Sequence, residues 1–235
     1  MDDIYTLFKS YHHLILIGSY PDGPVGGLLL TLFMASAGLL FAFPLAILMG
    51  IARTSHHKVI YLPVTLFSSI IRGLPVLMLV FWSYYGLPLL TGHTVSGVKT
   101  LIIALVIYEV AFLGEIVRAG IQSVPGGQRE AARTLGMTYW QTLRDVVLPQ
   151  ALFVMIPSIL NQFINLVKNT SLGYLIGVME LTYSAYQINT LELTKPLQVF
   201  GLLAIIYFII CFTLTRAVGK VETLIQRKRQ MTIQG

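Results

Sequence analysis

Charged side chains are scarce in this 235-residue sequence, since Asp, Glu, Lys and Arg together make up 11% of it. An ordinary soluble domain carries about 25%. Hydrophobic residues make up 55%, more apolar surface than a soluble fold of this length can bury. The single cysteine, Cys211, lies in an apolar run, which excludes a disulfide framework and favours a packing role. No Gly-x-x-x-x-Gly-Lys-[Ser/Thr] phosphate loop is present. The composition predicts an all-α integral membrane protein that does not itself bind ATP.

Five segments are long and apolar enough to cross a bilayer, which takes about 20 helical residues. The second is interrupted at Arg72-Gly-Leu-Pro75, and because Val59–Ile71 is too short to span alone, we expect one kinked or unwound span there. Pro149 precedes the fourth segment, near a helix start where its missing N–H costs little. The predicted spans are Gly26–Ala52, Val59–Leu90, Thr100–Val117, Gln150–Val178 and Leu197–Thr215. Tyr5–Ile17 is interpreted as a short amphipathic helix on the outer surface.

Lys and Arg are distributed unevenly between the two sides of these spans. Eleven of the 16 lie on the side of residues 53–58, 118–149 and 216–229, whereas Lys9, Lys99 and Lys195 lie on the other. Basic loops stay in the cytoplasm, so we expect the N-terminus outside and both the 118–149 loop and the C-terminus inside. The net charge of +6 is thereby explained by topology, without a nucleic-acid partner. The acidic first 24 residues do not resemble a cleavable signal peptide.

The loop between the third and fourth spans predicts two short helices joined by a turn. Gln128–Leu135 is rich in helix formers, and Gly136 fits the left-handed position that ends a helix. Thr138 and Gln141 have the spacing of a capping box that starts a second helix. Such a compact hairpin would suit a groove on a partner protein.

This loop resembles the EAA loop of ATP-binding-cassette (ABC) import permeases. The matching positions are Glu130, Ala131, Ala132, Gly136, Val146, Leu148 and Pro149, with Val146 where isoleucine is commoner. Further segments are similar to polar-amino-acid permeases of the histidine and glutamate import type. They are Ile71–Pro75, Glu115–Ile121, Gly127–Ala132 and Lys168–Gly177, and the likeness covers about residues 22–222.

The resemblance implies a five-span type I importer permease in the bacterial inner membrane, with an external segment 1–24, a permease domain 25–222 and a basic cytoplasmic tail 223–235. It implies that a dimer of ATPase subunits docks on Glu130, Ala131, Ala132, Gly136, Leu148 and Pro149 and holds the ATP and Mg²⁺. It also implies a second permease subunit, identical or paralogous, and a periplasmic amino-acid-binding protein. The permease itself would be no enzyme and would carry no cofactor or metal.

Ionisable groups at membrane depth are costly and become functional candidates. Arg72 lies near the midpoint of the second span, and Glu109 near that of the third. In the fourth span, polar residues recur at steps of three and four and form one helical stripe. These are Ser158, Asn161, Gln162, Asn165, Lys168 and Asn169.

We interpret Arg72 as the ligand of a substrate α-carboxylate, because a guanidinium can donate two parallel hydrogen bonds to it. Glu109 would meet the α-ammonium group or a cationic side chain. Asn161, Asn165 and Lys168 would complete the polar contacts. The alternative is that Arg72 and Glu109 pair with each other or cap unwound backbone, and only hold helices together. An acidic or neutral polar amino acid is the favoured cargo, although Glu109 would repel an acidic one unless Lys168 or a partner compensates.

Three further interpretations stay open at this point. Glu115 and Arg118, three residues apart, are expected to form a structural ion pair or a gate-side contact. The five histidines are interpreted as interfacial or solvated, because a metal site requires suitably spaced ligands that include acidic or thiol side chains. An ATP-independent secondary transporter or channel is the main alternative function, although no inverted repeat is visible. A membrane enzyme ranks below it.

Overall fold

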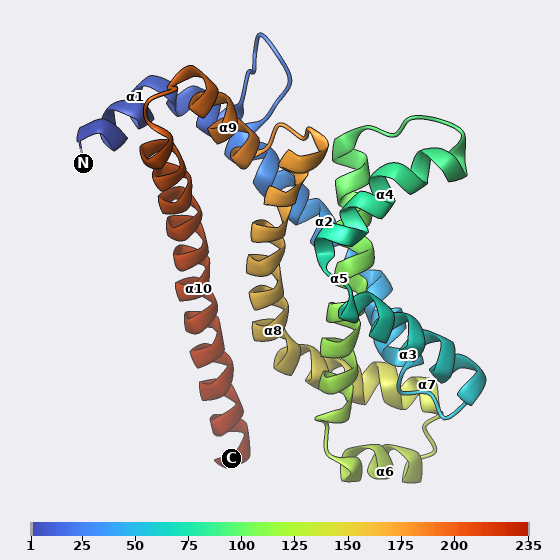
Figure 1. The fold of residues 1–235 in the computed structure, drawn as a ribbon. Helices are drawn as coiled ribbons and strands as arrows, with labels where there is room; N and C mark the ends of the chain where they lie inside the picture. Colours follow the sequence, from blue (N-terminus) through green and yellow to red (C-terminus); the bar gives the residue numbers. More distant parts are fainter. Residues whose placement is uncertain (1, 235) are drawn as a thin grey trace. The chain divides into compact units, whose positions relative to one another are not determined.

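The computed structural model describes residues 2–234, with side chains described for 3–225. These residues form helices and two isolated bridges, Gly18–Val25 and Gly27–Glu180. In chain order the elements are α1 (Asp2–Ile17), α2 (Gly27–Ala52), α3 (Lys58–Gly73), α4 (Val76–Thr91), α5 (Gly97–Gln122), α6 (Gly126–Thr134), α7 (Tyr139–Gln141), the π-helical turn η1 (Thr142–Val147), α8 (Leu148–Asn169), the 3-10 turn η2 (Thr170–Ile176), α9 (Leu181–Leu191) and α10 (Pro196–Gln234) (Figure 1). The predicted all-α class is confirmed.

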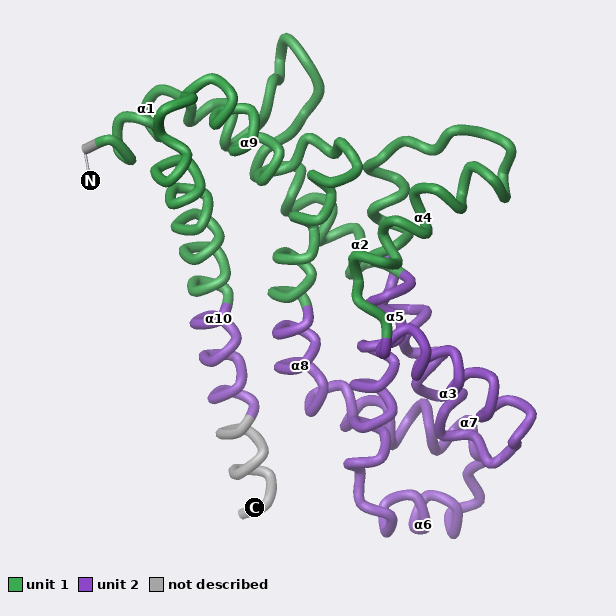
Figure 2. The backbone as a smooth tube through the Cα atoms, viewed as in Figure 1, with its two compact units in different colours: residues 1–40, 74–106, 163–214 green, residues 41–73, 107–162, 215–235 purple. Residues whose placement is uncertain are grey.

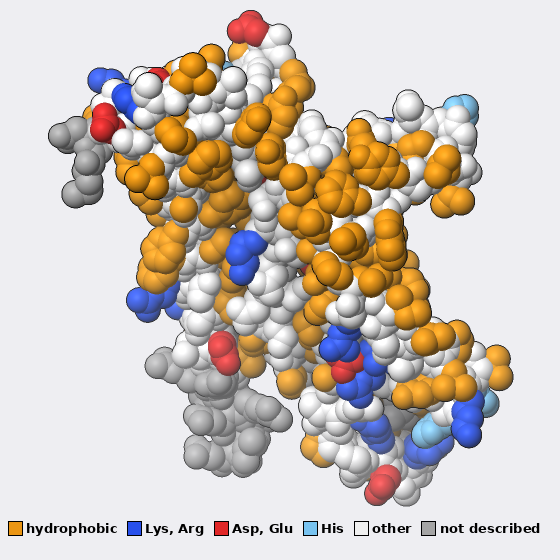
Figure 3. All heavy atoms as spheres, in the orientation of Figure 1, with side chains coloured by type: hydrophobic (Ala, Val, Ile, Leu, Met, Phe, Trp, Pro, Cys, Tyr) orange, Lys and Arg blue, Asp and Glu red, His pale blue; other side chains and the backbone are white. Residues whose placement is uncertain are grey.

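Within residues 2–234, four continuous helical segments are long and apolar enough to cross a membrane, and α3 with α4 makes a fifth if the pair is one broken span. α2, α5 and α10 correspond to the first, third and fifth predicted spans, and α5 extends beyond both predicted ends. Exposed apolar side chains cover much of the face in Figure 3. The large exposed apolar residues of the structure include Leu40, Leu48, Leu62, Leu66, Leu89 and Phe208. A surface of this kind belongs against lipid or another protein.

The second predicted span is broken, as the sequence indicated. α3 ends at Gly73, and α4 begins at Val76 after Pro75, with a sharp bend between them. Pro75 has φ −59° and ψ 132°, and its ring disfavours helical backbone at Leu74. Pro44, Pro63 and Pro88 lie inside helices that continue past them. A glycine two residues before a proline does not by itself explain the break, because Gly86 and Pro88 have the same spacing inside the continuous helix α4.

The fourth span differs from the prediction, because the second helix of the loop does not end before it. The chain is helical from Tyr139 to Ile176, so Pro149 lies inside a continuous segment and not at its start. The N–H of Leu148 donates to the carbonyl of Leu143, five residues earlier. With this widened turn the helix continues across Pro149. The hairpin is thus one short helix, α6, followed by the beginning of a long one.

The chain divides into two compact units, which Figure 2 colours separately. The first comprises residues 1–40, 74–106 and 163–214. Its larger core includes Met34, Leu101, Leu105 and Leu166, and a second cluster packs α1 against α9 and the start of α10. The helix at α1 is confirmed, whereas α9 has no counterpart among the predicted elements.

The second unit comprises residues 41–73, 107–162 and 215–235. Its core packs the end of α5 against η1 and the start of α8, through Val117, Ile121, Leu143, Val147 and Met155, among others. This packing holds the two ends of the 118–149 loop together. The side chains of residues 226–234, which include the basic segment of the tail, lie outside the described residues.

Candidate functional site

The first helix of the loop, α6, is tied to its surroundings at its N-terminal end. The Arg129 guanidinium donates to the carbonyl oxygens of Ile121 at 2.5 Å and Val124 at 3.4 Å, at the end of α5. The Gln150 amide donates to the Gln128 side chain at 2.9 Å. Cationic groups favour the carbonyl end of a helix, so these contacts hold α6 against α5 and α8.

The other end of α6 closes as the sequence predicted. Gly136 has φ +82°, the left-handed region that favours glycine. The N–H of Met137 donates to Ala132 and that of Gly136 to Arg133, which together form a Schellman motif. Both hydrogen bonds of the capping box between Thr138 and Gln141 are present. The sharp turn at the tip of the loop is therefore built from local signals.

The tip presents apolar side chains that the sequence analysis did not single out. Leu135 is 83% exposed and Trp140 is 66% exposed, and the Trp140 ring makes an edge contact with that of Tyr139. Of the two adjacent alanines in the predicted docking motif, Ala131 is exposed but Ala132 is buried inside the unit. Exposed apolar residues on a pinned helical turn are suited to docking. Their signal in the sequence is that Leu135 and Trp140 both lie within four residues of Gly136, which is predicted to end the first helix of the loop.

The remaining docking candidates differ in exposure. Glu130, Gly136 and Pro149 are exposed, and Leu148 is half-buried. The exposed carboxylate and the exposed turn lie on α6 and just after it, whereas Leu148 and Pro149 lie in the helix that follows η1.

A cluster of charges, which we name the Glu115 cluster, joins the turn after α2 to α3 and α5 in the second unit. Arg53 and Glu115 are in direct contact, Arg118 Nε lies 3.2 Å from both carboxylate oxygens of Glu115, and Arg72 Nη1 lies 3.4 Å from Oε2. The Arg72 guanidinium also lies over the Phe112 ring, 5.6 Å from its centroid. The expected pairing of Glu115 with Arg118 is confirmed and extends to two more arginines. The sequence could not predict the contacts of Arg53 and Arg72 with Glu115, because these two arginines lie on segments far from Glu115 along the chain.

Arg72 and Glu109 do not pair with each other in this structure. Arg72 contacts Glu115, while Glu109 Oε1 accepts a hydrogen bond from the Gln162 amide at 3.3 Å. Glu109 is fully buried, and its Oε2 has no hydrogen-bond partner among the described residues. A buried polar atom without a partner is costly, so this position is unusual for a residue with a purely structural role.

The polar stripe of α8 lies largely on an exposed face. Ser158, Asn161, Asn165 and Lys168 follow one another at steps of three and four residues, and all four are exposed. Between them Ile164, Leu166 and Val167 are buried. Polar side chains at membrane depth avoid lipid, so this face requires water or another protein. Asn161 belongs with Arg72 and Glu109 to the second unit, whereas Asn165 and Lys168 belong to the first.

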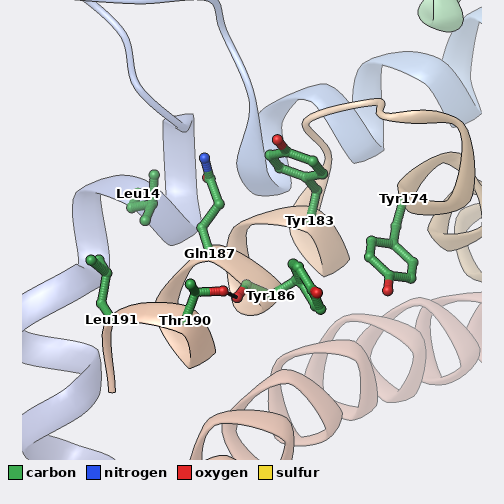
Figure 4. Close-up of a pocket in the computed structure, with 7 residues that line it drawn as sticks. All are labelled: Leu14, Tyr174, Tyr183, Tyr186, Gln187, Thr190 and Leu191. Carbon is green, nitrogen blue, oxygen red and sulfur yellow. Dashed lines mark hydrogen bonds between the residues drawn. The ribbon is translucent and has the colours of Figure 1, made fainter. Parts of the chain in front are cut away.

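A pocket of about 440 Å³ lies in the first unit, between the end of α1, η2 and α9 (Figure 4). Three tyrosines, Tyr174, Tyr183 and Tyr186, provide much of its lining, and the rings of Tyr174 and Tyr186 lie 5.3 Å apart. Gln187, Thr190, Leu14 and Leu191 complete it. The lining offers aromatic faces and neutral hydrogen-bonding groups, and no charged side chain.

A buried carboxyl group, Glu180, begins α9 and escaped the sequence analysis. It accepts hydrogen bonds from the N–H groups of Thr182 at 2.9 Å and Tyr183 at 3.0 Å, and from the Tyr207 hydroxyl at 3.2 Å. Burial raises its pKa to about 7, against the effect of the hydrogen bonds. Glutamate is not among the residues preferred at helix N-caps, so Glu180 did not mark the start of α9 in the sequence.

The histidines lie apart from acidic and thiol side chains that could complete a metal site. Among the residues that the structure describes, no group of three His, Cys, Asp or Glu side chains is placed to hold a metal ion. His12 Nδ1 lies 2.9 Å from the Lys9 carbonyl oxygen, within α1.

Comparison with known proteins gives concordant matches. Residues 42–221 match the family described as binding-protein-dependent transport system inner membrane component. The sequence is 36% identical over 195 residues to an inner membrane amino-acid ABC transporter permease protein of Escherichia coli strain K12. That match covers 81% of this chain, which spans about half (53%) of that longer relative. The sequence of this chain is also 36% identical over 198 residues to a probable glutamine ABC transporter permease protein of Bacillus subtilis strain 168. That match covers 83% of this chain and 90% of the relative.

The fold is similar to that in a crystal structure of an amino acid ABC transporter with histidines. The TM-score is 0.78 at 29% identity, and the match covers 95% of this chain and 96% of the other. Sequence and structure therefore agree, and the chain belongs to the family of binding-protein-dependent transport system inner membrane components.

Proposed function

We propose that this chain is the multi-pass inner-membrane permease subunit of an ABC importer and that its cargo is a polar amino acid. The observation that carries the proposal is the EAA loop, a short helix pinned to the ends of α5 and α8 that presents exposed apolar side chains at its tip. The relatives named above are permeases of amino-acid and glutamine transporters, which favours the same class of cargo.

The loop is the proposed docking site for the ATPase subunit, which would hold ATP and Mg²⁺. Glu130, Ala131 and Gly136 would lie at the contact, together with the exposed Leu135 and Trp140. A rigid, small apolar surface loses little entropy on binding, because the turn is already closed by its own hydrogen bonds. The buried Ala132 and the half-buried Leu148 would support this surface from within, and the exposed Pro149 remains a candidate for the contact itself.

The docking proposal is tested by Gly136→Asp, with Gly92→Asp as the matched control. Both glycines have left-handed backbone, at φ +82° and φ +72°, and neither has an atom close to the position of a new Cβ. The two substitutions therefore carry a similar backbone cost, but only one is on the loop. We expect Gly136→Asp to abolish copurification of the ATPase subunit or substrate-stimulated ATP hydrolysis, while membrane insertion remains normal. An assembled and fully coupled Gly136→Asp complex would contradict the proposal.

The exposed polar face of α8 is the proposed lining of the pathway. A single chain leaves Asn161, Asn165 and Lys168 exposed at membrane depth, and pairing with a second permease subunit would enclose them. The excess of Lys and Arg on the side of the EAA loop favours a cytoplasmic loop, an external N-terminus and an internal C-terminus. A binding protein would then deliver the amino acid from outside.

Arg72, Glu109, Asn161, Asn165 and Lys168 are the proposed substrate residues. Arg72 is 39% exposed and has a guanidinium edge for a carboxylate. Glu109 has an oxygen without a partner among the described residues, but its complete burial means that helices must move before a substrate reaches it. Neutral polar and acidic amino acids remain the favoured classes.

The cargo site is tested by uptake into vesicles that contain the reconstituted complex. Arg72→Ala should reduce uptake and substrate affinity, and Lys58→Ala serves as the control because Lys58 is an exposed cation at the start of the same helix. Normal uptake with unchanged affinity in Arg72→Ala would remove Arg72 from the site.

A further inference from the structure

The positively charged side chains of the Glu115 cluster outnumber its negatively charged ones. Arg53, Arg72 and Arg118 carry three positive charges against the single carboxylate of Glu115, which leaves a net formal charge of +2. The cluster lies at the ends of α2 and α3 and near the end of α5, and its side chains are largely or partly buried, where unbalanced charge is costly. It therefore has the capacity to take up a further anionic group.

The three arginines differ in how firmly their contacts hold them beside Glu115. Arg53 is only 9% exposed and also donates to the Ser68 hydroxyl at 3.1 Å. Arg118 contacts both carboxylate oxygens and donates to Gln122 as well. These two guanidiniums are held by several hydrogen bonds each.

Arg72 is the least firmly held of the three arginines. It reaches Glu115 through one nitrogen at 3.4 Å, and at 39% it is the most exposed member of the cluster. Its remaining described contact is with the face of the Phe112 ring, which orients a guanidinium plane without using its N–H edge. A second carboxylate can therefore approach this edge with two parallel hydrogen bonds.

We propose that Glu115 is an internal competitor for the carboxylate of the transported amino acid at Arg72. The incoming carboxylate displaces Glu115 from Arg72, and Glu115 remains neutralised by Arg53 and Arg118. Its return to Arg72 then helps to release the cargo. The cargo carboxylate brings one negative charge to the guanidinium edge of Arg72 while the cargo is bound. This inference rests on the proposed function and adds Glu115 as a positioning residue for release.

Two substitutions of Glu115 weaken the competitor in different ways. Glu115→Gln removes its charge, at the risk of leaving three arginines without an acid and destabilising the fold. Glu115→Asp keeps the charge but shortens the side chain by one methylene, which lengthens the contact with Arg72 first because that contact is already the longest. Glu222→Gln, an exposed carboxyl on α10, is the control.

The experiment uses the complete importer in lipid nanodiscs. The twenty amino acids are first screened for stimulation of ATP hydrolysis by the wild type, and the one that stimulates most is then used together with its α-carboxamide. For Glu115→Asp we expect KM for the amino acid to fall about two- to fivefold, the range of a partly exposed ion pair, and kcat to fall as release slows. The α-carboxamide should show no such change, since it lacks the competing group. Glu222→Gln should match the wild type.

Each outcome decides between the possibilities. If no amino acid stimulates the wild type, the proposed function fails and the inference fails with it. If the wild type responds but folded Glu115→Asp shows an unchanged or raised KM, the competitor role is wrong while the importer function stands. Equal changes for the amino acid and its α-carboxamide would also overturn it, because a merely structural role of Glu115 does not distinguish the two.

Discussion

The buried carboxyl of Glu180 makes a prediction that depends on the tertiary structure alone. Glu180 is fully buried, lies outside the candidate spans, and caps α9 while it accepts a hydrogen bond from Tyr207 of α10. The perturbation is Glu180→Gln, which keeps the size of the side chain and one acceptor oxygen but cannot ionise. The quantity to follow is the thermal stability of the permease as the pH changes.

Burial raises the pKa of the Glu180 carboxyl from 4.5 to about 7. Below pH 4.5 it is protonated in both the folded and the unfolded chain, so it has no effect on the pH dependence. Between pH 4.5 and about 7 the unfolded chain loses the proton while the folded chain keeps it, so stability falls as the pH rises. Above about 7 the full cost is present. A tenfold change in proton affinity corresponds to about 1.4 kcal/mol, which makes the cost about 3 kcal/mol.

The assay is thermal unfolding of the purified permease between pH 4.5 and 8, followed by tryptophan fluorescence. A loss of about 3 kcal/mol corresponds to about 6–12 °C for a chain of this size. We expect the melting temperature of the wild type to fall by that amount more than that of Glu180→Gln over this interval. Glu222→Gln, whose carboxyl is exposed, should retain the wild-type slope. Equal slopes for the wild type and Glu180→Gln would refute the reasoning.

Two further predictions use matched pairs of residues. A Cβ at Gly50 would collide with Val117 of α5, so Gly50→Ala should cost about 1–3 kcal/mol of stability by overpacking. Gly201→Ala, which meets no atom within 4 Å, should be neutral or gain about 0.5–1 kcal/mol; equal melting temperatures for the two variants would contradict this packing. Trp140 and Trp82 are 66% and 60% exposed, but only Trp140→Ala should weaken ATPase copurification. A matching loss in Trp82→Ala would show that the loop is not specific.

Sequence patterns that act locally predicted their structures well. The hydropathy of α2, α5 and α10, the break at Gly73–Pro75 and the turn at Gly136 each depend on residues a few positions apart. The Thr138 capping box is of the same kind. The hydrogen bonds or the apolar length that create the spans, the turn and the capping box are contained within one segment. The break is an exception, because Gly86-Leu87-Pro88 repeats Gly73-Leu74-Pro75 inside the continuous helix α4.

Local patterns failed where a neighbouring element decided the outcome. The helix that starts at Thr138 was expected to end before Pro149, but a π-helical turn carries it on into α8. That turn packs Leu143 and Val147 against the end of α5, a contact that the sequence does not reveal. α9 was missed because its cap, Glu180, is an acidic residue whose partners include Tyr207, 27 positions away.

The sequence by itself determined an all-helical membrane chain, the place of its broken span and the presence of an EAA loop, because composition, periodicity and capping act within a segment. Only the tertiary structure decided which charges meet. Arg72 lies with Glu115, Arg53 and Arg118, and Glu109 lies with Gln162. Partners on different helices are brought together by packing, and no spacing along one helix specifies them.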